Sequence, residues 1–436
     1  MVIQTSTPFD LTRLPDKEAL VDAFVGQHIK SLRTPAMVID RAVFAENCAR
    51  MHQSAKDWGA SFRGHVKSHK TAEGTRLQMV STVNKTEAVV VSTLVEAWSI
   101  VKAGLVADGT VKDILYGLPV GVNKIQDLAS LWDEMEPYGG VVRLMIDNAD
   151  QIRALEEYEK QRESPRSWSV FVKVDGGQKR AGVVPSLTAL RPILELLFAS
   201  PATTVYGFYC HAGNAYASTS MPEASSFLSA EVDCVNTAAL TATQICKELS
   251  IEPPVNGFVL AVGSTPTAHA ASAEARQQLD RLLHGRLELH AGNYPLLDLQ
   301  QVHTTLVGSQ RVAQRVLATV ISYYPNRSSD GSDEALCDAG AIAMSKDTGP
   351  SGGFGDVVGK PWRLGRVSQE HGILVTHPSG SLASGSQGGK LEVGEVIEIV
   401  GQHACLTLAA YPWYYIVDSK EGGDKVVDVW VPWKGW

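Results

Sequence analysis

Between residues 35 and 306 the chain repeats one local pattern, in which a short β-rich run is followed by a stretch that can form an amphipathic helix. This alternation is typical of βα units whose strands form a parallel sheet. Eight such runs are the number that closes a parallel barrel. The sequence therefore predicts an α/β fold built on a (β/α)8 TIM-like barrel. The runs are residues 61–66, 88–91, 113–116, 142–146, 170–174, 205–209, 258–262 and 287–290.

After residue 307 the pattern changes, because the expected strands are separated by Gly, Ser and Pro instead of helices. A chain of 436 residues also exceeds the size of a single hydrophobic core. We therefore expect a barrel domain at 35–306 and a second, mostly antiparallel β domain at 307–436, to which segment 1–34 belongs. Strands are expected at 312–324, 335–342, 372–375, 396–400 and 425–431, a helix within 16–32, and a surface loop at 378–389.

Charge and composition exclude several classes of protein. The formal net charge of −8 argues against a general nucleic-acid binder. No run approaches the roughly 18 apolar residues that a membrane helix needs, and the N-terminus lacks the pattern of a signal peptide. The six cysteines show no short repeated spacing, as expected of free thiols in a reducing compartment. We expect a cytoplasmic protein without nucleic-acid or membrane partners.

The first run leads into Lys67, which has His65, His69 and Lys70 as close neighbours in sequence. Residues that follow barrel strands converge on the face where barrel enzymes carry out their reactions. Neighbouring cations favour the neutral amine that attacks an aldehyde to form a Schiff base. On this stretch alone, a solvated basic loop is an equally good interpretation.

Two turns at neighbouring strand ends suit an anion. Gly263, Ser264 and Thr265 follow the seventh run, and the eighth run leads into a Gly-Asn-Tyr turn at 292–294. Small residues, backbone N–H groups and hydroxyls in such turns can hold a phosphate. Each turn taken alone is more often an ordinary turn. Their shared position on the face of Lys67 favours the binding site.

Three further side chains follow the fifth and sixth runs. Tyr209 and Tyr216 lie near the same rim and could donate to a planar ring or a phosphate, although a lone aromatic more often fills the barrel interior. Arg180 lies in a Gly-containing turn, where it could face the rim or pair with a local acid.

In the second domain His403 and Cys405 are two residues apart, so they share a face if the segment is extended. Imidazole and thiolate suit zinc, and two protein ligands leave positions for water or substrate, as in catalytic zinc sites. An isolated His-x-Cys pair is more often merely buried, and this alternative stays open on the pair alone.

Taken together, these stretches resemble the fold-type III enzymes of the alanine racemase superfamily, which bind pyridoxal 5'-phosphate (PLP). Within them the chain is most similar to the fungal-type D-serine dehydratase family, and the resemblance covers nearly the whole chain. The matching stretches are 32–40, 62–71, 170–182, 206–216, 262–267, 287–294, 366–372, 402–405 and 428–433.

The resemblance implies a reaction and a role for each residue. Lys67 carries PLP as a Schiff base and removes the α-proton of D-serine, while Zn²⁺ on His403 and Cys405 activates the β-hydroxyl group, giving pyruvate and ammonia. Tyr209 contacts the pyridine nitrogen. The family also implies a homodimer. The remaining cofactor-binding residues implied are Arg180, Tyr216, Gly263, Ser264, Thr265, Gly292, Asn293 and Tyr294.

Two other functions remain as alternatives. D-threonine aldolases resemble the same fold with the same lysine, but typically have an aspartate at the place of Cys405, so this cysteine favours the dehydratase. A PLP-binding protein without turnover resembles the barrel alone, and residues 307–436 count against it. The preference among D-serine, D-threonine and 3-hydroxy-D-aspartate stays open, because one methylene changes binding by only about 1 to 3 kcal/mol.

Overall fold

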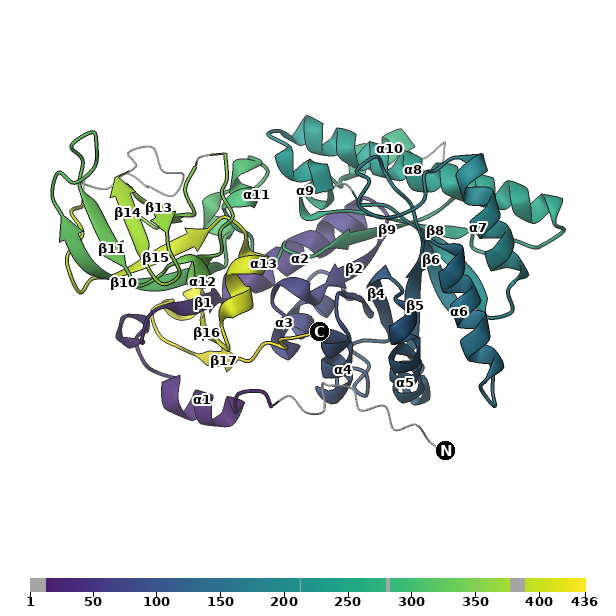
Figure 1. Ribbon diagram of the computed structural model, residues 1–436, viewed down its shortest axis with the longest axis horizontal. Coiled ribbons are helices and arrows are strands. Elements are labelled where there is room, and N and C mark those ends of the chain that lie inside the picture. The colour runs from purple at the N-terminus through teal and green to yellow at the C-terminus, as the bar shows by residue number, and fades with distance from the viewer. Residues whose placement is uncertain (1–12, 212, 280–282, 351, 377–388) are drawn as a thin grey trace.

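The computed structural model describes residues 13–211, 213–279, 283–350, 352–376 and 389–436. It contains a closed parallel barrel beside a second, nine-stranded sheet (Figure 1). The predicted barrel is confirmed, and each of its strands overlaps one of the predicted runs. The barrel strands are β2 (Ser61–His65), β3 (Ala88–Val91), β4 (Asp113–Pro119), β5 (Val141–Ile146), β6 (Trp168–Lys173), β7 (Thr203–Tyr209), β8 (Phe258–Val262) and β9 (Gly285–Ala291).

Helices surround the barrel because its strands are buried on both faces. All five residues of β8 are buried, and a strand buried on both sides needs a cover on its outer side. Local signals fix where the helices begin: Asp40 accepts hydrogen bonds from Ala42 N and Val43 N at the start of the first covering helix. The outer helices are α2 (Arg41–Asp57), α3 (Ala72–Met79), α4 (Leu94–Lys102), α5 (Ile125–Met135), α6 (Ala149–Lys160), α7 (Leu187–Ala199), α8 (Met221–Glu248), α9 (Thr265–His269) and α10 (Ala273–Leu279).

The barrel interior contains a buried ionic cluster and an apolar layer. Arg63 lies between Asp113 and Glu288, with its guanidinium 2.6 Å and 2.8 Å from their carboxylates. Next to this cluster, the Phe171 ring lies 5.9 Å from the guanidinium carbon of Arg63 and packs with other interior residues such as Met145. The interior is therefore filled, and a ligand has to bind at the mouth of the barrel.

The second sheet joins both ends of the chain. Its order is β11-β14-β13-β12-β15-β10-β1-β16-β17, and every pair is antiparallel except β1 with β16, so the prediction of a mostly antiparallel domain is confirmed. Its strands are β1 (Ala36–Asp40), β10 (Gln314–Tyr324), β11 (Glu334–Cys337), β12 (Gly355–Val357), β13 (Trp362–Val367), β14 (Gly372–Thr376), β15 (Val396–Gly401), β16 (Tyr414–Val417) and β17 (Asp428–Trp430).

The topology shifts the boundary that we expected at residue 35. Strand β1 lies after this boundary, yet it pairs with β10 and β16 of the second sheet and not with a barrel strand. The helix expected within 16–32 is shorter, since α1 spans Lys17–Phe24 and a 3-10 turn follows at Ile29–Ser31. The loop expected at 378–389 lies outside the described residues except for its last residue.

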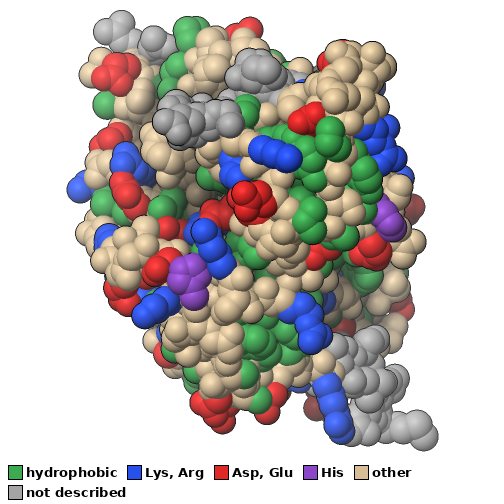
Figure 2. All heavy atoms as spheres, turned by 90° about the vertical axis from the view of Figure 1, so that its left-hand side faces the viewer, with side chains coloured by type: hydrophobic (Ala, Val, Ile, Leu, Met, Phe, Trp, Pro, Cys, Tyr) green, Lys and Arg blue, Asp and Glu red, His purple; other side chains and the backbone are tan. Residues whose placement is uncertain are grey.

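The C-terminal tail returns from the second sheet to the barrel (Figure 1). Trp433 is buried, and its backbone N–H donates to the Lys70 carbonyl at 2.8 Å. The outer end of the second domain mixes acidic, basic and hydrophobic side chains (Figure 2). All six cysteines lie among the described residues and none forms a disulfide. In the described part of the chain, each helix is too short or too polar to traverse a bilayer.

Candidate active site

Lys67 lies at the carboxyl end of the first barrel strand. Strand β2 ends at His65, and a 3-10 turn over Val66–Ser68 carries the lysine. Its backbone N–H donates to His65 Nδ1 at 3.4 Å. Within the described residues the Lys67 amine has no carboxylate or side-chain hydrogen-bond partner, whereas Lys70 pairs with buried Glu96 at 2.9 Å. Lys67 therefore presents a primary amine that no ion pair holds.

Three histidines share the barrel mouth with Lys67. Burial, followed by the charges of Lys67 and His290, lowers the pKa of His65 well below its usual value. Burial, followed by the charge of Arg180, lowers the pKa of His211 to about 3. Burial also lowers the pKa of His290, although its hydrogen bond to Glu288 opposes this. The mouth thus collects basic side chains whose imidazoles are neutral near pH 7.

The two predicted anion-binding turns lie side by side. The backbone N–H of Asn293 donates to Thr265 Oγ1 at 3.1 Å, which joins the turn after β9 to the turn after β8. Gly263 has φ +131°, and a Cβ atom there would lie 2.2 Å from the His290 carbonyl oxygen, so only glycine fits. Asn293 Oδ1 is buried without a hydrogen-bond partner among the described residues. These turns leave polar groups for a ligand.

The same mouth holds five further predicted residues of the barrel. A Cβ atom on Gly292 would lie 3.2 Å from His65 Cβ, and Ser264 opens helix α9 as its N-cap. Burial raises the pKa of Tyr209 and of Tyr216, so both phenols stay protonated. Arg180 is exposed at the rim, where its charge acts on Tyr209.

His403 and Cys405 lie at the same mouth, although they do not lie on a strand. They follow β15 at the start of helix α13 (Ala404–Thr407), close enough for their charges to interact. Burial opposes the charged form, but the interaction with Cys405 raises the pKa of His403 to about 9. Burial likewise opposes ionisation of Cys405, while His403 and Lys67 lower the pKa of its thiol. Ser68 Oγ lies 2.9 Å from Cys405 Sγ, so residues far apart in sequence form one site.

Asp298 connects the predicted anion-binding turn of Asn293 to the His-x-Cys segment. Its carboxylate accepts from Asn293 Nδ2 at 2.6 Å and from the backbone N–H of Ala404 at 2.7 Å. The side chain is completely buried, and burial raises the pKa of this carboxyl group. Movement of either segment would break one of these bonds.

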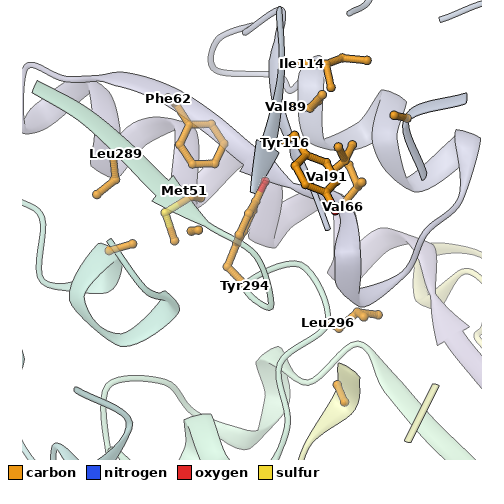
Figure 3. Packing of buried hydrophobic residues seen from close by; sticks show 14 of the residues in the cluster. Met51, Phe62, Val66, Val89, Val91, Ile114, Tyr116, Leu289, Tyr294 and Leu296 are labelled. Carbon is orange, nitrogen blue, oxygen red and sulfur yellow. The ribbon is translucent and has the colours of Figure 1, made fainter. Parts of the chain in front are cut away.

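Tyr294 is the predicted site residue whose side chain lies elsewhere. Its ring packs in the core outside the barrel, with Phe62 at 5.7 Å and with Met51 nearby (Figure 3). Its hydroxyl group is buried near Cys48 and Gln78, without a hydrogen-bond partner among the described residues. The Tyr294 side chain therefore points away from the mouth. Its position after a strand end did not reveal this direction, because the direction of a side chain depends on its packing.

Several groups of the site were not predicted. Ser68 and Asp298 contact it across domains, which no local pattern reveals. Asp347 lies in a loop of the second domain, with Oδ2 3.0 Å from His403 Nδ1. Lys173 ends strand β6 and lies over the Tyr209 ring at 4.0 Å. Lys173 could have been predicted, because a lysine at the end of a barrel strand is expected at the barrel mouth.

The barrel, the second β domain and the lysine after the first barrel strand define the alanine racemase class of two-domain proteins. The family model for the alanine racemase N-terminal domain matches residues 39–282, and that for the serine dehydratase domain matches residues 313–417. Among solved structures, alanine racemase from Bacillus anthracis covers 91% of this chain and 97% of its own, with a TM-score of 0.59 at 14% identity, which shows the shared fold alone.

Curated relatives narrow this class. The chain is 43% identical to the D-serine dehydratase of Schizosaccharomyces pombe over 97% of its length and 96% of that protein. It therefore belongs to the D-serine dehydratase family, whose members are lyases.

Solved structures of a related dehydratase agree with this assignment. D-threo-3-hydroxyaspartate dehydratase from Delftia sp. HT23 aligns with a TM-score of 0.76 at 26% identity, covering 94% of this chain and all of that one. A cysteine-to-alanine variant of a D-threo-3-hydroxyaspartate dehydratase, solved in the metal-free form, aligns with the same score, identity and coverage.

Proposed function

We propose that this protein is a PLP- and zinc-dependent dehydratase that converts D-serine to pyruvate and ammonia. The observation that carries the proposal is the junction at the barrel mouth, where Ser68, the residue after Lys67, contacts Cys405 at 2.9 Å. This contact brings the amine for Schiff-base chemistry close to the thiol–imidazole pair for a metal, so both can act on one small molecule. The family relatives support the same reaction.

The residues at the mouth fit PLP. An aldehyde needs an amine that no carboxylate holds, and Lys67 offers one. A phosphate needs small residues at a helix start, and Gly263 and Ser264 precede α9 where no larger residue than glycine fits the first position. Asn293 Oδ1 and His290 Nδ1 remain buried without hydrogen-bond partners among the described residues, as expected beside a polar ligand. PLP, when bound here, supplies a ring that accepts electron density from the α-carbon of the substrate.

The residues of the second domain fit zinc. Among the described residues no three His, Cys, Asp or Glu side chains form a metal-binding cluster, so the protein would supply two ligands, His403 and Cys405. Their thiol and imidazole are the donors that zinc prefers. Asp347 holds His403 Nδ1, which leaves Nε2 for a metal, an arrangement common behind zinc-bound histidines. Zn²⁺, when bound here, acts as a Lewis acid on the β-hydroxyl group and makes hydroxide a better leaving group.

The side chains of this chain then have separate tasks. Lys67 Nζ removes the proton from the α-carbon. Tyr209 would hold the pyridine nitrogen of a bound cofactor as a protonated phenol, since burial raises its pKa, and a neutral partner would draw less charge into the ring than an arginine. Elimination therefore depends more on activation of the leaving group than on delocalisation of charge into the ring. Asp298 holds the Asn293 turn and the Ala404 segment in fixed relative positions during the elimination.

Product analysis tests this proposal against an aldolase of the same fold. The PLP- and zinc-loaded protein is incubated separately with D-serine and with D-threonine, and pyruvate, 2-oxobutyrate, glycine and acetaldehyde are measured. We expect pyruvate and ammonia from D-serine in equal amounts. Glycine and acetaldehyde as dominant products from D-threonine, without pyruvate from D-serine, would instead establish a retro-aldol reaction.

A pair of lysine variants serves as the control for this assay. Lys67→Ala is expected to abolish pyruvate formation and the absorbance of the lysine-bound cofactor. Lys85→Ala, at a surface lysine outside the barrel mouth, should leave both unchanged. Full turnover by Lys67→Ala would contradict the role of this lysine.

We further propose that the enzyme is a homodimer of the cytoplasm. The family resemblance supports the dimer, and the scattered free cysteines support a reducing compartment. Sedimentation analysis of the purified protein and localisation of a tagged chain would test the two statements separately.

A further inference from the structure

Cys210 and Cys234 bring two free thiols together beside the barrel mouth. Cys210 directly follows strand β7, and Cys234 lies on helix α8, which packs against that strand. A Cβ atom on Gly176 would lie 2.8 Å from Cys210 Sγ and 3.9 Å from Cys234 Sγ, so both sulfurs lie close to one point. The reaction proposed above uses neither cysteine.

The two thiols differ in exposure and in acidity. Cys210 is 1% exposed, whereas Cys234 is partly buried and lies beside the exposed backbone of Gly176. The Cys234 thiol, followed by burial, raises the pKa of Cys210. The interaction with Cys210 lowers the pKa of Cys234. Burial and the charges of Asp233 and Asp175 oppose this second shift. Cys234 is therefore the thiol that solvent reaches and that ionises first.

This arrangement is typical of thiols that react with oxidants. Sensor cysteines are accessible, have a lowered pKa and lie next to a second cysteine that resolves the first oxidation product. Of the other four cysteines, Cys48, Cys246 and Cys337 are buried, and Cys405 belongs to the proposed metal site. In a reducing compartment, disulfides are rare and those that form are mostly transient.

We propose that Cys234 and Cys210 form a reversible oxidation site, which hydrogen peroxide converts into an intramolecular disulfide. The Cys234 thiolate attacks one peroxide oxygen, the O–O bond breaks, and the second oxygen leaves as water after it takes up a proton. The Cys210 thiol then attacks the sulfur of the resulting sulfenic acid, and the hydroxyl group leaves as water with the Cys210 proton. Two electrons pass from the sulfurs to the peroxide. Two molecules of glutathione reverse the reaction by exchange and are themselves joined as a disulfide.

Oxidation at this place acts on the barrel mouth. Cys210 lies between Tyr209 and His211 in sequence, and its backbone N–H donates to the Ala261 carbonyl oxygen at 3.0 Å. A disulfide holds its sulfurs only about 2.05 Å apart, so the end of β7 has to move toward α8. The Tyr209 ring, which Lys173 covers at 4.0 Å, would move with it. We expect the disulfide to lower turnover. This consequence rests on the proposed function, whereas the disulfide itself does not.

Peptide mapping of the oxidised holoenzyme tests the site. The PLP- and zinc-loaded protein is treated with a small excess of hydrogen peroxide, free thiols are alkylated, and the chain is cleaved after glutamates under non-reducing conditions. This cleavage separates Cys210, in peptide 196–223, from Cys234, in peptide 232–248. We expect a disulfide between these two peptides that reduced glutathione removes. Unlinked peptides, or a link to a different cysteine, would overturn the proposal.

Two alanine variants of helix α8 identify the reacting thiol. Cys246→Ala removes the other cysteine of peptide 232–248 and should leave formation of the disulfide unchanged. In Cys234→Ala the oxidation of Cys210 should be about tenfold slower, because the remaining thiol is buried. An equal rate of Cys210 oxidation in Cys234→Ala would contradict the role of Cys234 as the first thiol.

Turnover of the same samples tests the consequence at the barrel mouth. Peroxide should lower the wild-type kcat for D-serine about tenfold, because a small displacement of a site group is costly, and glutathione should restore it. Cys234→Ala should keep its rate. An equal loss in Cys234→Ala would place the damage elsewhere, such as at Cys405, and would overturn this consequence. Absence of pyruvate before oxidation would overturn the proposed function, and the peptide map would still decide the oxidation site.

Discussion

Replacing Arg63 by methionine should destabilise the barrel strongly. The guanidinium is buried between Asp113 and Glu288, with its side chain 1% exposed. Asp113 retains a second cation, because Arg143 Nε lies 2.7 Å away. Among the described residues Glu288 retains only His290, whose imidazole is neutral since burial lowers its pKa. Arg63→Met thus leaves one buried carboxylate without a cation, and removal of one partner of a buried ion pair costs about 3 to 5 kcal/mol.

Urea unfolding followed by tryptophan fluorescence measures this loss. Adding Glu288→Gln to Arg63→Met should recover part of it, because the uncompensated charge is then gone. Arg153→Met, which breaks an exposed pair with Asp150, is the control and should change the free energy of unfolding by less than about 0.5 kcal/mol. A loss below about 1 kcal/mol for Arg63→Met, or a further loss on adding Glu288→Gln, would refute the reasoning.

Three other predictions follow from the site and its support. Gly263→Ala should abolish cofactor binding, measured by absorbance, because its Cβ would lie 2.2 Å from the His290 carbonyl oxygen; normal binding would show that the turn can yield. Burial lowers the pKa of His69 from 6.5 to about 4, so the unfolded chain takes up a proton that the folded protein does not, and stability should fall by about 3 kcal/mol as the pH is lowered from 6.5 to 4. In His69→Asn the slope of the urea midpoint against pH should be shallower, and an equal slope would disprove this origin. Trp433→Ala should cost about 3 to 5 kcal/mol in urea unfolding and loosen the Lys70 loop, and a loss under 1 kcal/mol would show that the tail is dispensable.

The sequence predicted the barrel because eight buried runs with intervening helices leave few other arrangements. The expected boundary at residue 35 placed β1 in the barrel domain, although no strand was predicted there, because a buried run followed by a helix is locally compatible with a βα unit. Only its pairing with β10 and β16 shows that it belongs to the second sheet. Strands such as β12, which has three residues, carry too little periodicity to be found.

The sequence predicted those residues of the candidate site whose location at the barrel mouth follows from the position of the backbone alone. Lys67 and the turn at Gly263 follow strands whose ends must converge. The direction of the Tyr294 side chain depends on packing against helix α2, which no local pattern encodes. The contacts of Ser68 with Cys405 and of Asp298 with Ala404 join residues more than 100 positions apart, so only the folded chain brings them together.

The central claim is that the amine of Lys67 and a zinc ion on His403 and Cys405 act together on D-serine. The most direct measurement is the rate of pyruvate formation from D-serine before chelation, after removal of the metal, and after zinc is returned, with PLP present throughout. The account predicts that activity is lost with the metal and restored by zinc. An unchanged rate in the metal-free enzyme would contradict it.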